Sequence, residues 1–227
     1  MKIFAFIFAR KGSKGIKNKN IIKIKNKPLI YYSIKVAKEL KKIKAIYVSS
    51  DCDKILKYAR SQGANTIKRP KSLSMDHSAE ILAWKHAIKK LKNQKIKFDV
   101  FLSLPTTAPL RSAKDINKIL NLIKKNKDID FVVTAKKSHH NPWFNMLIKK
   151  KNGYFKKVIN KKKIFKTRQE LPTTFDLTTV GYAARPEYIL KKNNLMSGKV
   201  KIVEIPEERA LDIDTKFDLR LAKLLIK

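Results

Sequence analysis

The sequence predicts an α/β protein with a mostly parallel, doubly wound sheet. Short apolar runs rich in β-branched and aromatic residues alternate along the chain with segments of helical periodicity. Strands separated by helices of this length pair in parallel and are covered on both faces. The 227 residues suit one domain, and a hydrophobic fraction of 43% is enough for a core. We therefore expect a single domain over residues 1–227, with its ligand site beyond the carboxyl ends of the strands.

The first 134 residues contain four expected strands and four expected helices. Three of the helices have a local boundary signal. Pro28 opens the first, Gly63 follows the second, and Ser112 with Asp115 is placed to cap the fourth. The expected strands are residues 3–8, 45–49, 98–102 and 131–134, and the expected helices are residues 28–40, 53–62, 77–91 and 112–126.

The strand–helix alternation breaks at about residue 141. Residues 141–148 and 153–158 alternate like antiparallel strands, and residues 178–184 read as another strand. We therefore expect a β-rich arm at about residues 141–185. A strand at residues 200–205 and a helix at residues 215–226 then complete the domain.

The formal net charge of +36 suggests a nucleic-acid partner, but the distribution of the charge argues against a specific one. Most of the 54 basic residues are lysines, and they are scattered over nearly every segment. Nucleic-acid readers usually concentrate their charge and use arginine for planar contacts. We expect no specific nucleic-acid binding, although weak adhesion to polyanions follows from the charge alone.

The hydrophobic runs and the cysteine content indicate a cytoplasmic protein without a membrane partner. No apolar run approaches the roughly 18 residues that a membrane span needs. The single Cys52 excludes an internal disulfide framework and is typical of a reducing compartment.

A glycine-rich basic loop follows the first expected strand. Gly12 and Gly15 permit close approaches that a side chain would block, so that backbone N–H groups can point at anionic oxygens. The loop fits neither the P-loop nor the dinucleotide-binding pattern. It reads as a phosphate cradle, and the alternative is a solvated basic turn. Its cationic and hydroxyl side chains are those of Arg10, Ser13, Lys14 and Lys19.

Two aspartates near the end of the chain indicate a metal site. Asp212 and Asp214 are two residues apart, so in an extended segment their side chains point to the same side. Carboxylate oxygens suit a hard cation such as Mg²⁺. Helix capping by Asp214 and Thr215 is the alternative, and it explains only one of the two aspartates.

Three further segments suit ligand binding, and each also has a purely structural interpretation. Arg69 precedes a segment that suits a capped helix, with Asp76 or Ser78 as the cap. Residues 104–111 form either a ligand loop or a rigid connector after a buried strand. Arg168 is either a solvated charge or a bidentate clamp for a carboxylate.

The first loop resembles the signature of the N-acylneuraminate cytidylyltransferases, also called CMP-sialic acid synthetases. Four later segments resemble that family in the same order, and the Asp-Ile-Asp-Thr run at residues 212–215 resembles its magnesium-binding motif. The resemblance implies a Rossmann-like nucleotidyltransferase fold with a dimerisation arm. The residues that it assigns to nucleotide binding are Arg10, Gly12, Ser13, Lys14, Gly15, Lys19, Asn20, Arg69 and Ser78.

The same resemblance implies roles in sugar binding and catalysis, with two departures from the family pattern. Pro105 stands where a substrate-contacting Gln is usual, and Glu80 stands where some members have a Ser. The absence of a metal-binding Asp from residues 104–111 argues against the related enzymes that activate Kdo. The implied substrate residues are Thr107, Arg111, Arg168 and Gln169, the implied Mg²⁺ ligands are Asp212 and Asp214, and the implied catalytic residues are Arg168, Lys19 and Arg10.

The resemblance implies that CTP and a nine-carbon 2-keto sugar acid react to give a CMP-sugar and pyrophosphate. It also implies a homodimer in which the arm helps to form the neighbouring site. Two alternatives stay open, another sugar nucleotidyltransferase with a different base or acceptor and a basic nucleic-acid-binding protein.

Overall fold

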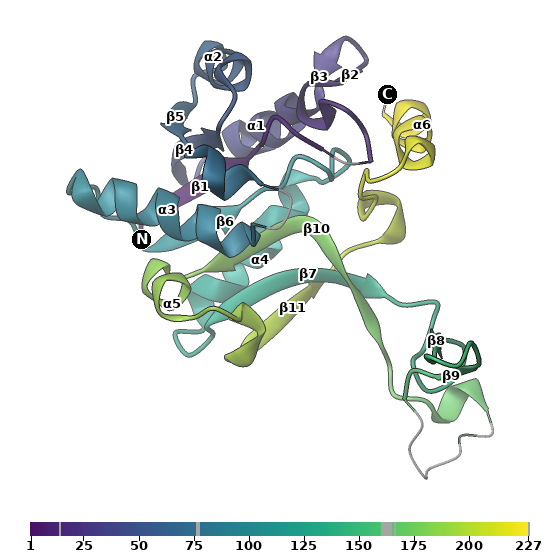
Figure 1. Ribbon diagram of the computed structural model, residues 1–227. Coiled ribbons are helices and arrows are strands. Elements are labelled where there is room, and N and C mark those ends of the chain that lie inside the picture. Colours follow the sequence, from purple (N-terminus) through teal and green to yellow (C-terminus); the bar gives the residue numbers. More distant parts are fainter. Residues whose placement is uncertain (14, 76–77, 160–164, 166, 227) are drawn as a thin grey trace.

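The fold is built on a seven-stranded sheet with the strand order β11-β7-β10-β6-β1-β4-β5 (Figure 1). The computed structural model describes residues 1–13, 15–75, 78–159, 165 and 167–226. Neighbouring strands of this sheet pair in parallel except β10, which runs antiparallel to β6 and β7. The predicted mostly parallel sheet is confirmed. The strands are β1 Ile3–Phe8, β2 Lys23–Ile24, β3 Lys27–Pro28, β4 Ile43–Ser50, β5 Asn65–Lys68, β6 Val100–Ser103, β7 Phe131–Lys137, β8 Leu147–Lys149, β9 Phe155–Lys157, β10 Phe175–Ala184 and β11 Val200–Glu204.

Helices cover both faces of the sheet, as the alternating pattern predicts. The helices α1, α2 and α4 pack on one face, and α3 and α5 pack on the other. None of the helices in the described ranges is long and apolar enough to cross a membrane. The α-helices are α1 Leu29–Glu39, α2 Asp53–Ser61, α3 Glu80–Asn93, α4 Ala113–Lys125, α5 Pro186–Lys191 and α6 Lys216–Leu225, and the 3₁₀ turns are η1 Lys19–Ile21, η2 Lys71–Ser74, η3 Arg168–Glu170, η4 Leu195–Ser197 and η5 Glu207–Arg209.

Strand β1 is buried on both faces, which explains its unbroken apolar sequence. Ile3, Ala5 and Ile7 join the core under α1, α2 and α4. Phe4 and Phe6 point the other way and join the core under α3 and α5. The strand therefore fixes the loop that follows it at the centre of the sheet.

The predicted helix boundaries agree with local capping chemistry except at α3. Ser112 and Asp115 form a capping box at the start of α4, and Arg209 pairs with the buried Asp115 at 2.9 Å. Gly63 follows α2 with a φ of 74°. Helix α3 begins at Glu80 instead of residue 77, and none of the described side chains caps it. The predicted cap by Ser78 is wrong, and Asp76 lies outside the described residues.

Strands β8 and β9 form a separate two-stranded sheet at the far ends of β7 and β10, away from the layered body (Figure 1). The predicted arm at residues 141–185 extends too far, because residues 175–184 form β10 in the main sheet. Tyr182 accordingly stacks in the core near Trp84 and Phe131. The β8–β9 hairpin exposes large apolar side chains, including Leu147 at 63% and Phe155 at 60%.

Candidate functional site

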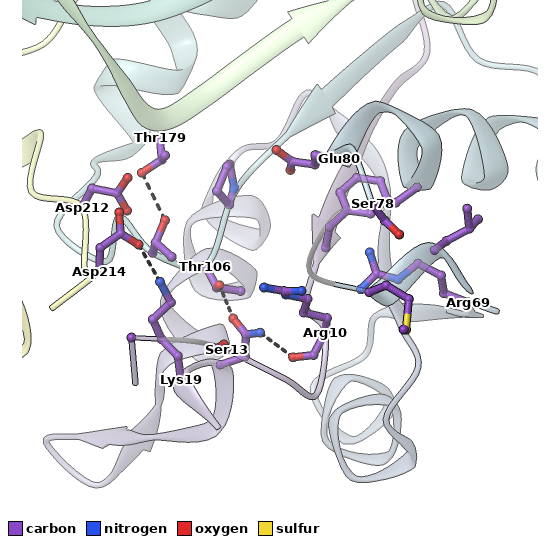
Figure 2. A pocket seen from close by; sticks show the side chains of 18 residues that line it. Arg10, Ser13, Lys19, Arg69, Ser78, Glu80, Thr106, Thr179, Asp212 and Asp214 are labelled. Atoms are coloured by element: carbon purple, nitrogen blue, oxygen red, sulfur yellow. Dashed lines mark hydrogen bonds and ion pairs between the residues drawn. The ribbon is translucent and has the colours of Figure 1, made fainter. Parts of the chain in front are cut away.

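A cavity of about 530 Å³ opens beyond the carboxyl ends of β1, β5 and β6 (Figure 2). The segments that follow these strands contribute most of the cavity wall, and the segment of residues 212–214, near the end of the chain, contributes the rest of one side. The residues that line it are Phe8, Arg10, Ser13, Gly15, Lys19, Asn20, Arg69, Leu73, Met75, Ser78, Glu80, Ala83, Pro105, Thr106, Thr107, Thr179, Asp212 and Asp214.

Lys19 joins the glycine loop to the paired aspartates. Its Nζ donates to the Ile213 carbonyl at 2.7 Å and to Asp214 Oδ1 at 2.8 Å. These bonds connect positions 194 and 195 residues apart in sequence. Lys19 therefore also shapes the site, a role that its assignment to nucleotide binding did not include.

The two glycines of the loop are not equivalent. A Cβ added at Gly15 would lie 2.3 Å from the Asp214 carbonyl oxygen, so the close backbone contact requires glycine there. A Cβ added at Gly12 would meet no heavy atom within 4 Å, and Gly12 does not line the cavity. The predicted need for glycine therefore holds at position 15.

Asn20 lies buried beneath the loop and connects it to the segment after β6. Its Nδ2 donates to the Arg10 carbonyl at 2.8 Å, and its Oδ1 accepts from the Thr106 hydroxyl at 2.5 Å. Asn20 therefore holds the backbone of Arg10 at the cavity wall, besides lining the cavity itself.

Asp212 and Asp214 lie beside each other at one end of the cavity (Figure 2). Burial raises the pKa of the Asp212 carboxyl, and the charge of Asp214 adds to this, whereas the Thr107 and Thr179 hydroxyls act in the opposite direction. Asp212 Oδ1 is buried and has no hydrogen-bond partner within the described parts of the chain.

This donor set fits Mg²⁺. A buried carboxylate oxygen without a partner destabilises the folded protein unless a cation or a hydrogen-bond donor reaches it. Magnesium typically takes one or two carboxylates and fills its shell with water and substrate phosphates. No cluster of three or more His, Cys, Asp or Glu side chains occurs among the described residues. Asp212 and Asp214 would therefore be the ligands that the described part of the protein supplies to the ion.

Arg69 and Glu80 form the opposite wall. Arg69 is 6% exposed, and its Nε and Nη2 have no hydrogen-bond partner in the part of the chain that the structure describes. Glu80 is exposed by its accessible surface, yet the protein atoms packed around its carboxyl desolvate it in part and raise its pKa. Trp84 Nε1 donates to Glu80 Oε1 at 3.2 Å, and this bond and the charge of Arg69 partly offset the rise in pKa.

Arg111, which the resemblance assigns to the substrate, does not line this cavity. Its guanidinium is buried behind the wall, where it donates to the Ser33 hydroxyl at 2.8 Å, to the Thr179 carbonyl at 3.1 Å and to the Pro105 carbonyl. Burial lowers the pKa of Arg111 to about 9, and the neighbouring Tyr182 and Asp212 act in the opposite direction. The residue braces the cavity wall from within, because a buried cation needs these acceptors.

The remaining predicted residues lie elsewhere or outside the described residues. Gln169 lines a separate hollow of about 460 Å³ in the arm, together with Asn141 and Phe144. Arg168 begins the turn η3 in the same arm. Lys14 lies outside the described residues. The structure therefore brings five of the predicted loop residues together with Arg69, Ser78, Thr107 and the aspartates, but does not bring Gln169 to them within one chain. The five loop residues are Arg10, Ser13, Gly15, Lys19 and Asn20.

Sequence reasoning missed several wall residues. Thr106 is adjacent to the predicted Thr107, and its place in the same short segment is a usable signal. Thr179 comes from β10, whose position between β6 and β7 has no local signature in the sequence. Asp51 directly follows β4, but it lines a neighbouring hollow and accepts from the Lys11 amide at 2.9 Å.

Comparisons with known proteins agree with this geometry. The family model described as cytidylyltransferase matches residues 4–176. The chain is 35% identical over its whole length to post-translational flagellin modification protein B of Campylobacter coli, covering 95% of that protein. It is 34% identical to CMP-N,N′-diacetyllegionaminic acid synthase of Campylobacter jejuni, over 99% of this chain and 95% of that one.

The fold has a close structural counterpart. The structure of CMP:2-keto-3-deoxy-manno-octonic acid synthetase complexed with CTP superposes with a TM-score of 0.73 at 15% identity, and covers 100% of this chain and 98% of that one. At that identity the likeness concerns the fold alone. The family match and the full-length relatives establish the class, and the chain belongs to the cytidylyltransferase family of nucleotide-transferring enzymes.

Proposed function

We propose that the protein transfers CMP from CTP to a nine-carbon 2-keto sugar acid, an N-acylneuraminate or a related nonulosonate, and releases pyrophosphate. The observation that carries this proposal is the cavity in which a cationic glycine loop faces two aspartates. The full-length similarity to a CMP-N,N′-diacetyllegionaminic acid synthase supports the sugar-acid class.

In the proposed reaction the anomeric hydroxyl oxygen of the sugar acid attacks the α-phosphorus of CTP. The bond from that phosphorus to the bridging oxygen of the β-phosphate breaks, pyrophosphate leaves, and the hydroxyl proton is released. Little covalent chemistry falls to the protein, which positions the two substrates and stabilises charge on the phosphates.

The loop supplies the phosphate contacts in this proposal. Arg10, Ser13 and Lys19 line the cavity next to the aspartates, and Lys14 retains the phosphate role that the family resemblance implies. Lys19 would share its ammonium between Asp214 and a phosphate oxygen, because an ammonium has three donors and two are already used. Its position beside Asp214 would keep the loop and the metal end of the site together.

We propose that Asp212 and Asp214 hold Mg²⁺. The unpartnered Oδ1 of Asp212 and the exposed carboxylate of Asp214 support this assignment. The ion, when bound, neutralises phosphate oxygens and favours ionisation of the attacking hydroxyl. The Thr107 and Thr179 hydroxyls, 3.2 Å apart, would keep the Asp212 side chain directed into the cavity.

We further propose a homodimer in which the arm of one copy completes the sugar site of the other. The exposed apolar side chains of the β8–β9 hairpin support a covered surface, because an isolated patch of this kind is usually buried by a partner. Gln169 lies in the arm and outside the cavity of its own chain, which is compatible with a role in the neighbouring one. Arg168, the first residue of η3, would accompany it and meet the sugar carboxylate.

We propose that residues 1–227 form a single catalytic domain that carries this arm. A cytoplasmic location is proposed with it, because CTP is made and used there.

A nucleotide panel tests the proposed function. Pyrophosphate release should require both a nonulosonic acid and CTP, and GTP, UTP and dTTP should support it poorly. Equal turnover with another nucleotide would favour a different sugar nucleotidyltransferase, and a lack of release with every nucleotide and acid would reject the class of reaction proposed here.

A further inference from the structure

Glu80 lines the cavity, yet neither the phosphate loop nor the paired aspartates give it a task. Its Oε1 accepts from Trp84 Nε1 at 3.2 Å, and Trp84 is buried at 4% exposure. The bond fixes the carboxylate on the cavity side of the first turn of α3. Some N-acylneuraminate cytidylyltransferases have at this position a serine that contacts the nucleotide, and the family pattern does not say what a glutamate does in its place.

The labelled side chains divide the cavity into two ends (Figure 2). Asp212, Asp214 and Lys19 lie on one side of Arg10, and Arg69 and Ser78 lie on the other, whereas Glu80 lies above Arg10 in this view and comes from α3 on the Ser78 side. The first end suits phosphates and a metal ion. The second end is therefore left for the nucleoside.

The nucleoside end offers one acceptor and one donor group. Glu80 and Arg69 are close enough for their charges to affect each other. Two buried nitrogens of Arg69, Nε and Nη2, have no hydrogen-bond partner in the described ranges, and the bond from Trp84 engages only Oε1 of the Glu80 carboxylate. The apolar side chains of the same cavity, suited to the faces of a base, are Phe8, Leu73, Met75 and Ala83.

This donor–acceptor pair is complementary to cytosine and not to uracil. Cytosine presents an exocyclic amine as donor and N3 and O2 as acceptors. A carboxylate accepts well from that amine, whereas uracil would present a carbonyl oxygen to it, so that two acceptors would meet.

We propose that Glu80 accepts a hydrogen bond from the exocyclic amine of cytosine and thereby selects CTP over UTP, with Arg69 donating to the acceptors of the same base edge. This inference rests on the proposed function, because it needs CTP in the cavity. It adds a residue that determines nucleotide specificity.

Binding measured by calorimetry with CTP, UTP and dCTP tests the proposal without any sugar acid. Glu80→Gln keeps the shape and can donate to uracil O4, so the ratio of CTP to UTP affinity should fall at least tenfold relative to the unchanged protein. Glu80→Ala should also lower the ratio, by weakening CTP more than UTP. Glu187→Gln is the matched control, since Glu187 is an exposed glutamate in the first turn of α5 and does not line the cavity, and it should leave the ratio unchanged.

The outcomes separate this inference from the proposed function. If Glu80→Gln loses CTP and UTP affinity equally and keeps its melting temperature, the selection of CTP by Glu80 is overturned in favour of a general effect on the cavity. A change confined to the CTP to dCTP ratio overturns it in favour of a ribose contact. An unchanged CTP to UTP ratio in both Glu80 variants also overturns it. If the unchanged protein binds neither nucleotide, the proposed function fails, and this inference fails with it.

Discussion

Gly15→Ala should damage the site through a single backbone contact. The added Cβ would lie 2.3 Å from the Asp214 carbonyl oxygen, and real Cβ atoms stay at least 3.0 Å from such atoms. The loop and the 212–214 segment must therefore separate by 3.0 − 2.3 = 0.7 Å or more. The bonds from Lys19 to Ile213 and Asp214 hold these two segments together, so they must stretch or break.

The expected magnitude follows from that displacement. Overpacking costs typically about 1–3 kcal/mol of unfolding free energy. A misplacement of about 1 Å can cost about 100-fold in rate. We therefore expect pyrophosphate release to fall by about 10- to 100-fold, with a loss of stability of about 1–3 kcal/mol in urea unfolding.

Gly12→Ala is the matched control from the same loop. Its Cβ meets nothing within 4 Å, and Gly12 has no positive φ. The change should be neutral or stabilise the protein by up to about 1 kcal/mol, because it restricts the unfolded chain. Activity and stability of Gly15→Ala that match those of Gly12→Ala would refute the contact argument.

Three further predictions concern the metal end, the α4 cap and the arm. Asp212→Asn and Asp214→Asn should each lower turnover at least about tenfold with an unchanged melting temperature, and full activity in excess chelator would contradict this. Asp115→Asn should lower the unfolding free energy at pH 7 by about 2–3 kcal/mol, since it weakens charged hydrogen bonds with Arg209 and Ser112. Burial alone would raise the pKa of Asp115, but the hydrogen bonds from Arg209 and Ser112 outweigh burial and hold the pKa below its ordinary value. The stabilisation by Asp115 is therefore present above the pKa of the unfolded state and is lost as the pH falls through the pKa of the folded state. The difference in unfolding free energy between Asp115→Asn and the unchanged protein should accordingly shrink at low pH in urea unfolding, and a difference that stays constant would contradict this prediction. Mixing Arg168→Ala chains with Asp212→Asn chains should restore part of the activity by forming dimers with one intact site, and no recovery after confirmed subunit exchange would exclude the shared site.

The sequence predicted the layered core well because its signals are local. The alternating apolar runs, the Ser112–Asp115 box and Gly63 all act within a few residues. Strand β5 was missed because it has only four residues, of which Ile67 alone is buried. The end of the arm was misplaced because β10 pairs with strands far away in the sequence.

The sequence indicated which segments meet at the site but not the contacts between them. Loop composition and the spacing of the aspartates indicated phosphate and metal binding, yet no local pattern shows that Lys19 bonds to Asp214. Arg111 was expected at the substrate because a motif lists residue types and not the direction in which each side chain points. Thr179 reaches the cavity through the topology of the sheet alone.

The most direct measurement of the central claim is the identity and amount of the two products. Incubation with CTP, Mg²⁺ and a panel of nonulosonic acids, followed by mass spectrometry and a pyrophosphate assay, should give a CMP-linked sugar acid and pyrophosphate in equal amounts. Omission of either substrate should abolish both products. Pyrophosphate without a CMP-linked sugar acid, or no product with any acid in the panel, would contradict the account.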